Sequence, residues 1–445
     1  MNIALLSPSG IMYRKGGIFP TALRYAPLTL TTLAGLVPED LDTKVSIYDE
    51  ASGDIPLEID ADLIGISAIT GTANRAYAYA DHFRSQGKTV VLGGVHPTLL
   101  PDEASLHADS VVSGMAFETW PELLRDFSKG QLESRYVQRA RPDLTNLPQP
   151  RRDLLDNTYI SKSSIQATFG CPYACDFCAV AATNKKYLHR PIDEVIAELD
   201  SLKGPLTVFV DPSPTEDIRY VKQLWKEMIP LKKKWAGLAT VKIADDPELM
   251  DLAAESGCKG LLLGFEDVSQ DTIIGINKPF NLVENYRHVV DELHQRGIAI
   301  NGTFMFGMDG QTKDSFKRTV DFVHEAKIDL PRFAIYTPFP GTPSFSRLEQ
   351  EGRILTRNWA LYDAQHLVYQ PHGLDAEEII EGQLWAWEQT YKIGSIAHRI
   401  MRRNTNPLIG LVSNIGYKMY GSGLKDYSEE KMLTLQKNWD PGEKL

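Results

Sequence analysis

In residues 1 to about 130, short apolar runs alternate with stretches whose apolar residues recur at helical spacing. The stretches at 28–36 and 73–86 predict helices, and the second one ends at Gly87. The apolar runs predict parallel strands over residues 3–6, 44–48, 63–67, 89–93 and 110–114. Apolar strands that alternate with helices indicate an α/β fold with a doubly wound parallel sheet, in which ligands bind beyond the carboxyl ends of the strands.

Residues 161 to about 345 repeat a strand-then-helix rhythm. The predicted strands cover residues 164–168, 206–210, 235–241, 260–265, 298–306 and 333–336. Polar residues stand at or just after the ends of several of these runs, namely Asp211, Thr240, Glu266, Asp309 and Tyr336. Repeated strand–helix units are typical of a β/α barrel, whose chemistry lies at the carboxyl ends of the strands.

The segment between these two halves has a different composition. Its prolines and arginines, Pro148 and Pro150 among them, favour an extended connector that runs over the surface. The predicted organisation is therefore a doubly wound domain, a linker, a barrel and a mainly helical C-terminal domain. In order, these units cover residues 1–132, 133–160, 161–345 and 346–445.

The C-terminal region carries two further patterns. Residues 376–392 predict a helix whose aromatic stripe includes Trp385 and Trp387. Such a stripe is typical of core packing, with a substrate platform as the alternative. Residues 398–403 are basic and residues 407–412 are apolar. We expect this region to cap the mouth of the barrel, with a helix lying on a membrane surface as the alternative.

Composition and charge narrow the classes of function. A chain of 445 residues with 43% hydrophobic and 24% charged residues is typical of a soluble protein with two or three domains. Its net charge of −11 argues against a general nucleic-acid binder. The apolar first residues lack the basic start of a signal peptide, and no apolar run reaches the roughly 18 residues of a membrane span. The sequence predicts a cytoplasmic protein without a transmembrane segment.

Three of the four cysteines, Cys171, Cys175 and Cys178, have the spacing C-x3-C-x2-C. Three thiolates on one short loop can bind three irons of a [4Fe-4S] cluster and leave the fourth iron open to a ligand. A closed zinc site requires a fourth ligand, usually from a second pair, whereas Cys258 stands alone. The clustering also suits a reducing compartment. An open iron–sulfur loop is the main prediction, with zinc or redox-active cysteines as alternatives.

This loop, with Phe177 before its last cysteine, resembles the signature of the radical S-adenosylmethionine (SAM) enzymes. The resemblance implies that the open iron chelates the amino and carboxylate groups of SAM. It also implies that residues 161–345 form a partial (β/α)6 barrel, and it places Phe177 at the cofactor.

The same resemblance assigns roles to residues at the ends of the barrel strands. Glu266 matches the position that binds polar groups of SAM, where a carboxylate can accept hydrogen bonds, although an acid at a helix start would look the same. Asp211 and Thr240 are assigned to cofactor binding as well, but Pro212 stands where relatives of Asp211 often have a second acid. Tyr336 opens a Tyr-Thr-Pro-Phe-Pro-Gly-Thr stretch that resembles the motif closing on the adenosyl group, and it is the candidate catalytic residue. A turn without function is the alternative.

With this loop downstream, residues 1–132 resemble the cobalamin-binding domain of cobalamin-dependent radical SAM enzymes. The resemblance assigns cofactor binding to Ser67, Thr70, Gly71, Thr72, Gly93, Gly94, Val95, His96, Ser113, Gly114 and Glu118. Met115 and Phe117 stand where family members often have a glycine and an acid. His96 alone fits a loop-bracing role equally well. A sheet that binds phosphate, flavin or nothing is the alternative, and without G-x-G-x-x-G after the first strand a nicotinamide dinucleotide is not expected.

Other cobalamin domains use D-x-H-x-x-G, whose histidine binds cobalt, and this motif is absent from residues 1–132. Whatever faces cobalt is therefore expected from the loop at 67–72. The resemblance implies that an electron from the cluster cleaves SAM to methionine and a 5′-deoxyadenosyl radical. That radical removes a hydrogen from an unactivated carbon, and the substrate radical takes a methyl group from methylcobalamin.

The implied partners are an electron donor and a substrate, with no nucleic acid. The whole chain resembles archaeal methyltransferases that modify methyl-coenzyme M reductase, which suggests a protein substrate and C-methylation of one of its glutamines. Two alternatives remain. One is a cobalamin-dependent radical SAM enzyme that acts on a lipid or a tetrapyrrole, as a methylase or ring cyclase. The other is a non-catalytic corrinoid-binding protein.

Overall fold

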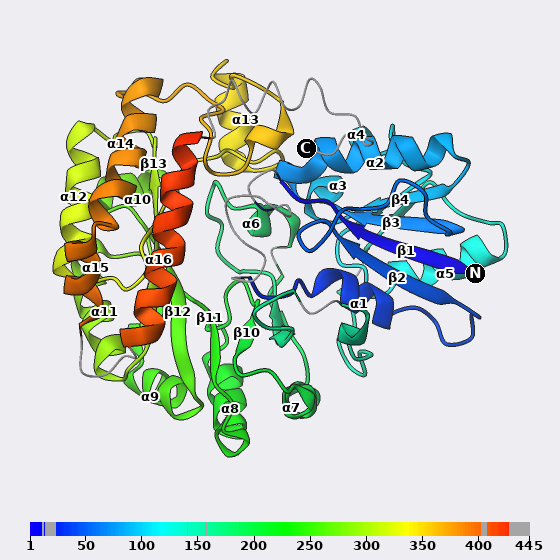
Figure 1. Cartoon of the computed structure of the whole chain (residues 1–445), viewed down its shortest axis with the longest axis horizontal. Helices are drawn as coiled ribbons and strands as arrows, with labels where there is room; N and C mark the ends of the chain where they lie inside the picture. Colours follow the sequence, from blue (N-terminus) through cyan, green and yellow to red (C-terminus); the bar gives the residue numbers. More distant parts are fainter. Residues whose placement is uncertain are drawn as a thin grey trace.

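The computed structural model describes residues 1–10, 13, 24–139, 141–155, 158–184, 186–401 and 407–426. Two parallel sheets of six strands lie side by side, the N-terminal sheet on the right of Figure 1 and the barrel sheet on the left. The predicted combination of a doubly wound sheet, a partial barrel and a mainly helical C-terminus is confirmed.

The first sheet has the strand order β2-β1-β3-β4-β5-β6. Its strands are β1 (Asn2–Ser7), β2 (Lys44–Asp49), β3 (Leu63–Ser67), β4 (Thr89–Gly93), β5 (Ser110–Ser113) and β6 (Arg135–Val137). The helices around it are α1 (Thr29–Gly35), α2 (Ala73–Ser85), α3 (Val95–Leu99), α4 (Pro101–Ala104) and α5 (Thr119–Ser128). Apolar side chains alternate between the faces, so that one face packs on α1 and α5 and the other on α2 and α4. This burial of both faces explains the nearly continuous apolar runs.

Strand β6 corrects one expectation. Residues 133–160 were expected to be an extended connector, but Arg135–Val137 pair with β5 as the edge strand of the first sheet. Tyr136 is buried in the core beneath α5. A three-residue strand with one buried side chain is too short to show the period of a strand, and its neighbouring prolines and arginines dominate the pattern.

The second sheet has the strand order β7-β10-β11-β12-β13-β14, and its edge strands do not pair with each other. These strands are β7 (Ser164–Ile165), β10 (Thr207–Phe209), β11 (Trp235–Ala239), β12 (Cys258–Glu266), β13 (Ala299–Phe306) and β14 (Arg332–Ile335). The helices between and after them are α7 (Ile192–Ser201), α8 (Ile218–Met228), α9 (Pro247–Glu255), α10 (Gln270–Gly275), α11 (Tyr286–Gln295), α12 (Lys313–Glu325) and α13 (Pro343–Gln350). The sheet is thus an open barrel with helices outside (Figure 1).

The cysteine loop lies between β7 and β10. It follows β8 (Thr168–Phe169) and precedes α6 (Ala179–Thr183), and β8 pairs antiparallel with β9 (Leu188–His189). The short hairpin returns the chain to the barrel after α6. This places the loop at the carboxyl edge of the barrel sheet, which is the edge predicted to carry chemistry.

The region after the barrel packs in two directions. Phe345, Trp359, Tyr362 and Val368 join the apolar cluster of α2 in the first domain, so residues 345–368 bridge the two sheets. The remaining helices, α14 (Ala376–Thr390), α15 (Ile393–Ile400) and α16 (Pro407–Gly423), pack against the barrel. The domain limits given above stay a prediction, and the contacts show that the segment after residue 345 belongs to both cores.

Within the aromatic stripe of α14, the innermost residue, Trp387, packs in the core. Trp387 is buried, and its indole N–H donates to the carbonyl of Phe333 at 3.2 Å, whereas Trp385 is 38% exposed. On α16, Tyr417 and Tyr420 face α14, and five apolar residues face outward: Leu408, Leu411, Val412, Ile415 and Met419. Within the described ranges, no helix is both long and apolar enough to cross a membrane. Residues 402 and 403 of the basic stretch lie outside the described residues.

Candidate active site

The cysteine loop is held in shape by its own backbone and by two neighbouring segments. The N–H of Cys178 donates to the carbonyl of Cys175 at 3.1 Å, and the N–H of Cys171 donates to the carbonyl of Asn184 at 3.4 Å. Asn277, after α10, donates from its amide to the carbonyl of Ala174 at 2.8 Å. These contacts fix the backbone of the short loop that carries the three thiols.

Gly170 is required where the loop begins. Its φ is +72°, and a Cβ at this position would lie 2.2 Å from the carbonyl oxygen of Lys186. Only glycine adopts this backbone conformation freely and leaves room for such an approach. The tight entry turn therefore explains the glycine immediately before the first cysteine.

The three thiols share one electrostatic environment. Burial is the main cause that raises the pKa of Cys175 to about 12; Lys278 opposes it, and the neighbouring thiols Cys178 and Cys171 add to it. Metal ligands must be thiolates, so a bound cation has to provide the charge that the protein alone does not. The donor set of three cysteines without a fourth fits a [4Fe-4S] cluster that keeps one iron open.

Glu266 lies at the end of β12 beside this loop, as the sequence predicted. Its φ of +65° is unusual for a residue other than glycine, and the pairing of β12 with β13 is irregular at this point. Lys278 donates to the Glu266 carboxylate at 2.7 Å and to the carbonyl of Gly264 at 2.8 Å. Strained backbone of this kind concentrates at functional sites, where surrounding contacts hold it. Lys278 was missed because it stands alone in a loop with no sequence motif.

A second acid, Glu216, occupies the loop after β10. Its carboxylate accepts a hydrogen bond from Ser213 Oγ at 2.7 Å and lies 3.5 Å from Thr240 Oγ1. Burial raises the pKa of Tyr173, and a hydrogen bond to Glu216 raises it further. Glu216 therefore links the cysteine loop to Thr240, one of the predicted cofactor residues. It was missed because it stands five residues after Asp211, beyond the strand end.

Asp211 has a different set of contacts. One of its carboxylate oxygens accepts hydrogen bonds from the backbone N–H groups of Ala167 and Thr168 and from the Thr168 hydroxyl, at 2.5 to 3.0 Å. The side chain is fully buried, and burial raises its pKa to about 6. These contacts favour a brace for the strand that enters the cysteine loop over direct contact with a cofactor.

Two aromatic pairs border the loop. Tyr173 stacks on Phe280 with ring centroids 3.9 Å apart, and Phe177 lies 6.1 Å from the ring of Tyr336. The Tyr336 hydroxyl hydrogen-bonds Ser344 Oγ at 2.5 Å, and the Ser344 N–H donates to the carbonyl of Asp176 at 3.0 Å. Burial raises the pKa of Tyr336. Tyr336 thereby ties the last strand to the cysteine loop, and its predicted catalytic role stays a prediction.

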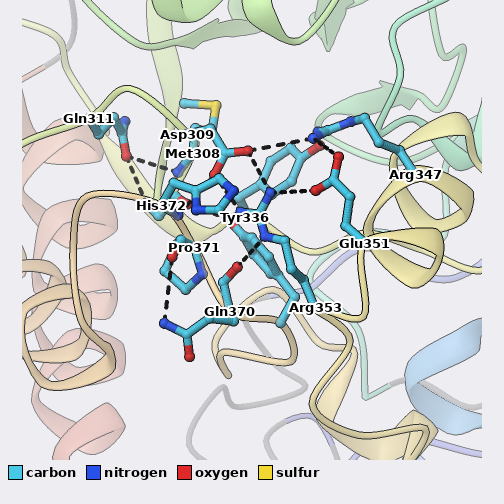
Figure 2. Close-up of polar contacts among 12 residues, drawn as sticks. Met308, Asp309, Gln311, Tyr336, Arg347, Glu351, Arg353, Gln370, Pro371 and His372 are labelled. Atoms are coloured by element: carbon cyan, nitrogen blue, oxygen red, sulfur yellow. Dashed lines mark hydrogen bonds and ion pairs between the residues drawn. The ribbon is translucent and has the colours of Figure 1, made fainter.

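Asp309, after β13, is the centre of an ion-pair network at the same edge. Figure 2 shows Arg347 and Arg353 converging on its carboxylate, with Arg353 in a two-pronged contact at 2.6 and 3.0 Å. Arg353 also donates to the carbonyl of Gln370, and the N–H of His372 donates to Asp309 at 3.0 Å. The network fastens the bridging segment to the barrel and leaves Asp309 with a structural role.

A cavity of about 580 Å³ lies between the carboxyl ends of the first sheet and the barrel. Its wall in the first domain includes five of the predicted residues: Ser67, Gly93, Gly94, Val95 and Gly114. Gly94 has a φ of +100°, and a Cβ there would lie 2.7 Å from the carbonyl of Ala68. Glycine backbone forms part of this wall beside mostly apolar side chains, which suits a large flat cofactor such as cobalamin.

The other predicted residues of this domain brace the loops. His96 is fully buried, with its ring nitrogens 3.4 Å from Thr70 Oγ1 and 3.3 Å from Glu103, which also accepts from the Trp359 indole at 2.7 Å. Ser113 donates to the carbonyl of Pro97. Thr72 Oγ1 accepts the N–H of Ile69, and Glu118 accepts the N–H of Asp143. Gly71 lies against the backbone of Tyr362. None of these lines the cavity.

Residues that the sequence did not assign complete the cavity. Met115 and Phe117, which depart from the family pattern, line it, and Phe117 packs edge-on against Phe169 of the barrel at 5.2 Å. Leu147 and Pro148 also line it, so part of the expected surface connector is a cavity wall. These residues come from three separate segments, and no local pattern marks them.

Comparisons with known proteins now give the class. Residues 165–323 match the Radical SAM superfamily. The chain is 34% identical over 394 residues to bacteriochlorophyllide d C-12(1)-methyltransferase of Chlorobaculum tepidum, covering 85% of this chain and 86% of that protein. It is 30% identical over 422 residues to bacteriochlorophyllide d C-8(2)-methyltransferase of the same organism, covering 88% and 91%.

The fold has solved counterparts. The tryptophan-bound radical SAM methyltransferase TsrM from Kitasatospora setae aligns with a TM-score of 0.68 at 17% identity, over 98% of this chain and 99% of that one. The cobalamin-dependent radical SAM enzyme OxsB aligns with a TM-score of 0.69 at 14% identity, over 98% and 74%. The chain is therefore a radical SAM enzyme. Within that superfamily it belongs to the family of the bacteriochlorophyllide d C-12(1)- and C-8(2)-methyltransferases.

Proposed function

We propose that this protein is a C-methyltransferase that uses a [4Fe-4S] cluster, SAM and cobalamin to methylate an unactivated carbon of a tetrapyrrole. The observation that carries the proposal is the contact between the cysteine loop and the cavity. Asn184 accepts the N–H of Cys171 through its carbonyl, and the same residue lines the cavity. A cluster on the loop and a cofactor in the cavity would thus act on one substrate between them.

The residues divide the work between the two sides. Cys171, Cys175 and Cys178 would hold the cluster, Glu266 and Glu216 offer acceptors for the polar groups of SAM, and the glycine-lined wall would hold cobalamin. When bound, these groups supply the radical and the methyl group. Tyr336 and Asp211 keep the loop in place, and the packing of Phe117 on Phe169 helps to exclude water from the space between.

The tetrapyrrole substrate is proposed on two grounds. The two curated relatives described above are named for methylation of bacteriochlorophyllide d, and each is matched over more than four fifths of its length. Apolar residues such as Leu28, Met115, Phe117 and Trp120 dominate the cavity wall.

A glutamine of methyl-coenzyme M reductase, suggested by overall sequence resemblance, is the alternative substrate. We further expect a low-potential electron donor as partner and a cytoplasmic location, because an open cluster and free thiols require a reducing compartment. A donor of this kind would reduce the cluster before each cleavage of SAM.

The test is an anaerobic reaction with reconstituted cluster, cobalamin, reductant and SAM. Bacteriochlorophyllide d and a glutamine-containing peptide from methyl-coenzyme M reductase are supplied separately, and products are analysed by mass spectrometry. A gain of one methyl on the tetrapyrrole, with 5′-deoxyadenosine and S-adenosylhomocysteine, is the expected result. Methylation of the peptide alone would replace the tetrapyrrole by the alternative, and cobalamin binding without either coproduct would indicate a non-catalytic corrinoid protein.

A further inference from the structure

The segment after α10, residues 276–281, runs along the cysteine loop and is here called the strap. The carbonyl of Ile276 accepts the N–H of Asp176 at 3.2 Å. Asn277 donates from its amide to the carbonyl of Ala174 at 2.8 Å and to the carboxylate of Asp176 at 3.1 Å. The start of the strap therefore fixes the loop backbone on both sides of the second cysteine.

The far end of the strap is tied to the cysteine loop and to the barrel. Phe280 stacks on Tyr173 of the cysteine loop, with ring centroids 3.9 Å apart. Asn281 is fully buried and donates from its amide to the carbonyl of Gly264 on β12 at 2.8 Å. Because both ends are held, the residues between them stay against the cysteine loop.

Lys278 lies between these two ends. It is buried, and its ammonium donates to the Glu266 carboxylate at 2.7 Å and to the carbonyl of Gly264 at 2.8 Å. The same nitrogen lies 5.7 Å from the centroid of the Phe280 ring. A carboxylate, a carbonyl and an aromatic face all favour a cation, so together they hold the positive charge in one place.

The Lys278 charge acts on the thiol of Cys175. Burial raises the pKa of this thiol, and Lys278, which lowers it, is the strongest of the charged groups that act on it. The opposing effect of Glu266 is weaker, and it ranks behind those of Cys178 and Cys171. Although Lys278 and Glu266 form an ion pair, the side of the pair that faces Cys175 is therefore positive.

A second lysine at the cysteine loop has a different environment. Lys242, after β11, donates to the hydroxyl of Tyr173 at 3.1 Å, and its side chain is exposed. Water and salt screen an exposed charge, whereas a buried charge is screened much less. Of these two lysines, Lys278 is the one whose charge reaches the thiols with little screening.

A cation in this position favours the reduced form of an iron–sulfur cluster. Three thiolates make the site anionic, and reduction by one electron adds a further negative charge. A buried positive charge stabilises the more negative state, so the reduction potential rises. The low-potential donor expected above supplies this electron before SAM is cleaved.

We propose that Lys278 sets the reduction potential of the cluster held by the three cysteines, and that Glu266 attenuates its effect through the ion pair. Lys278 is thus a positioning residue that acts through the charge it holds beside the thiolates. The inference is independent of the substrate proposed above, because reduction of the cluster precedes reaction with any substrate.

The test is an anaerobic potentiometric titration of the reconstituted enzyme, with cobalamin bound and without SAM. Electron paramagnetic resonance measures the fraction of reduced cluster at each potential. Lys278→Met should lower the equilibrium constant for reduction about tenfold, which corresponds to a shift of ~59 mV to more negative potential. Lys278→Arg keeps the charge, and its potential should stay close to that of the parent enzyme.

Glu266→Gln makes the opposite change. It removes the negative partner of Lys278 and keeps the shape of the side chain, so the reduction potential should rise. Lys259→Met is the matched control, because Lys259 is exposed at the other end of β12 and its loss changes the net charge equally. The control should leave the potential unchanged, and iron content verifies cluster assembly in every variant.

Equal midpoint potentials in the parent enzyme, Lys278→Met and Glu266→Gln would overturn the inference. A loss of SAM affinity in Lys278→Met without a shift in potential would also overturn it, since Lys278 would then act as a ligand of SAM. If Lys278→Met assembles no cluster, the titration of Glu266→Gln decides, and an unchanged or lowered potential in that variant would refute the role of the ion pair.

Discussion

The two sides of the interdomain space are built by different means. On the barrel side, ionisable and metal-binding side chains lie close together. They are the three thiols, the Lys278–Glu266 ion pair and the Glu216 carboxylate with its hydrogen bond from Ser213. On the side of the first sheet, the wall combines glycine backbone with mostly apolar side chains, and polar residues such as His96 and Thr70 lie behind it and brace the loops. One side would bind its cofactor by coordination and charge, and the other by shape.

This difference explains why the two sides are unequally visible in the sequence. Coordination requires particular residue types at a fixed spacing, so the cysteine loop is readily recognised. A shape-based cradle requires only that side chains be absent and that neighbouring loops be held still. Many residues satisfy the second requirement, and the polar residues nearest the glycines, such as His96 and Thr70, are buried braces.

The largest effect should come from removing one coordinating side chain. Cys175→Ala is expected to abolish cluster assembly and formation of 5′-deoxyadenosine, because two thiolates cannot hold the cluster open at one iron. Cobalamin binding should be unchanged, since the cavity wall does not include this residue. Iron content and absorbance spectra measure cluster assembly on the barrel side, and cobalamin retention measures binding on the side of the first sheet. Loss of cobalamin together with the cluster would show that the two sides are not independent.

The converse change acts on the shape-based side. Gly94→Ala should lower the free energy of unfolding by about 3 kcal/mol or more, since a Cβ would lie 2.7 Å from a backbone oxygen and φ is +100°. It should weaken cobalamin retention and leave iron content intact. Gly87→Ala is the control, because Gly87 has a φ of +77° with open space around it and should lose only about 1 kcal/mol. Urea unfolding measures the free energy of unfolding of both variants. Equal losses would show that the close approach of Gly94 to the Ala68 carbonyl does not matter.

A third prediction concerns Asp211, whose buried carboxylate is expected to brace the strand that enters the cysteine loop. Its pKa is raised from the ordinary value of 3.8 to about 6, so the folded protein holds a proton that the unfolded chain releases. Stability from this group is therefore full below about pH 4 and is lost as pH rises to about 6, by at most about 3 kcal/mol. Asp211→Asn should remove that decline in urea unfolding of the cluster-free protein. An unchanged pH profile would contradict the assignment.

The smallest effect is expected at Glu266. Glu266→Gln keeps the shape and removes the charge, so SAM affinity should fall about tenfold while cluster and cobalamin content stay intact. Equilibrium binding of SAM to the reconstituted protein measures this change. Glu255→Gln, on an exposed position of α9, is a matched control. Unchanged affinity in Glu266→Gln would remove this residue from the SAM site.

The sequence by itself determined the elements and the coordinating loop. Strand periodicity is a local property, and the strands of both sheets lie within a few residues of the predicted ranges, apart from the short β6. The spacing of Cys171, Cys175 and Cys178 is also local, because one loop carries all three. Gly94 and Gly114 follow the same logic, since backbone with a φ near +100° after a strand favours glycine.

Only the tertiary structure decided which polar residues face the shared space. Lys278 meets Glu266 across a turn, and Glu216 reaches Thr240 from another strand. His96, which the sequence left open between ligand contact and brace, is fully buried. Such outcomes depend on contacts between segments far apart in sequence, and a one-dimensional pattern carries no distance between them.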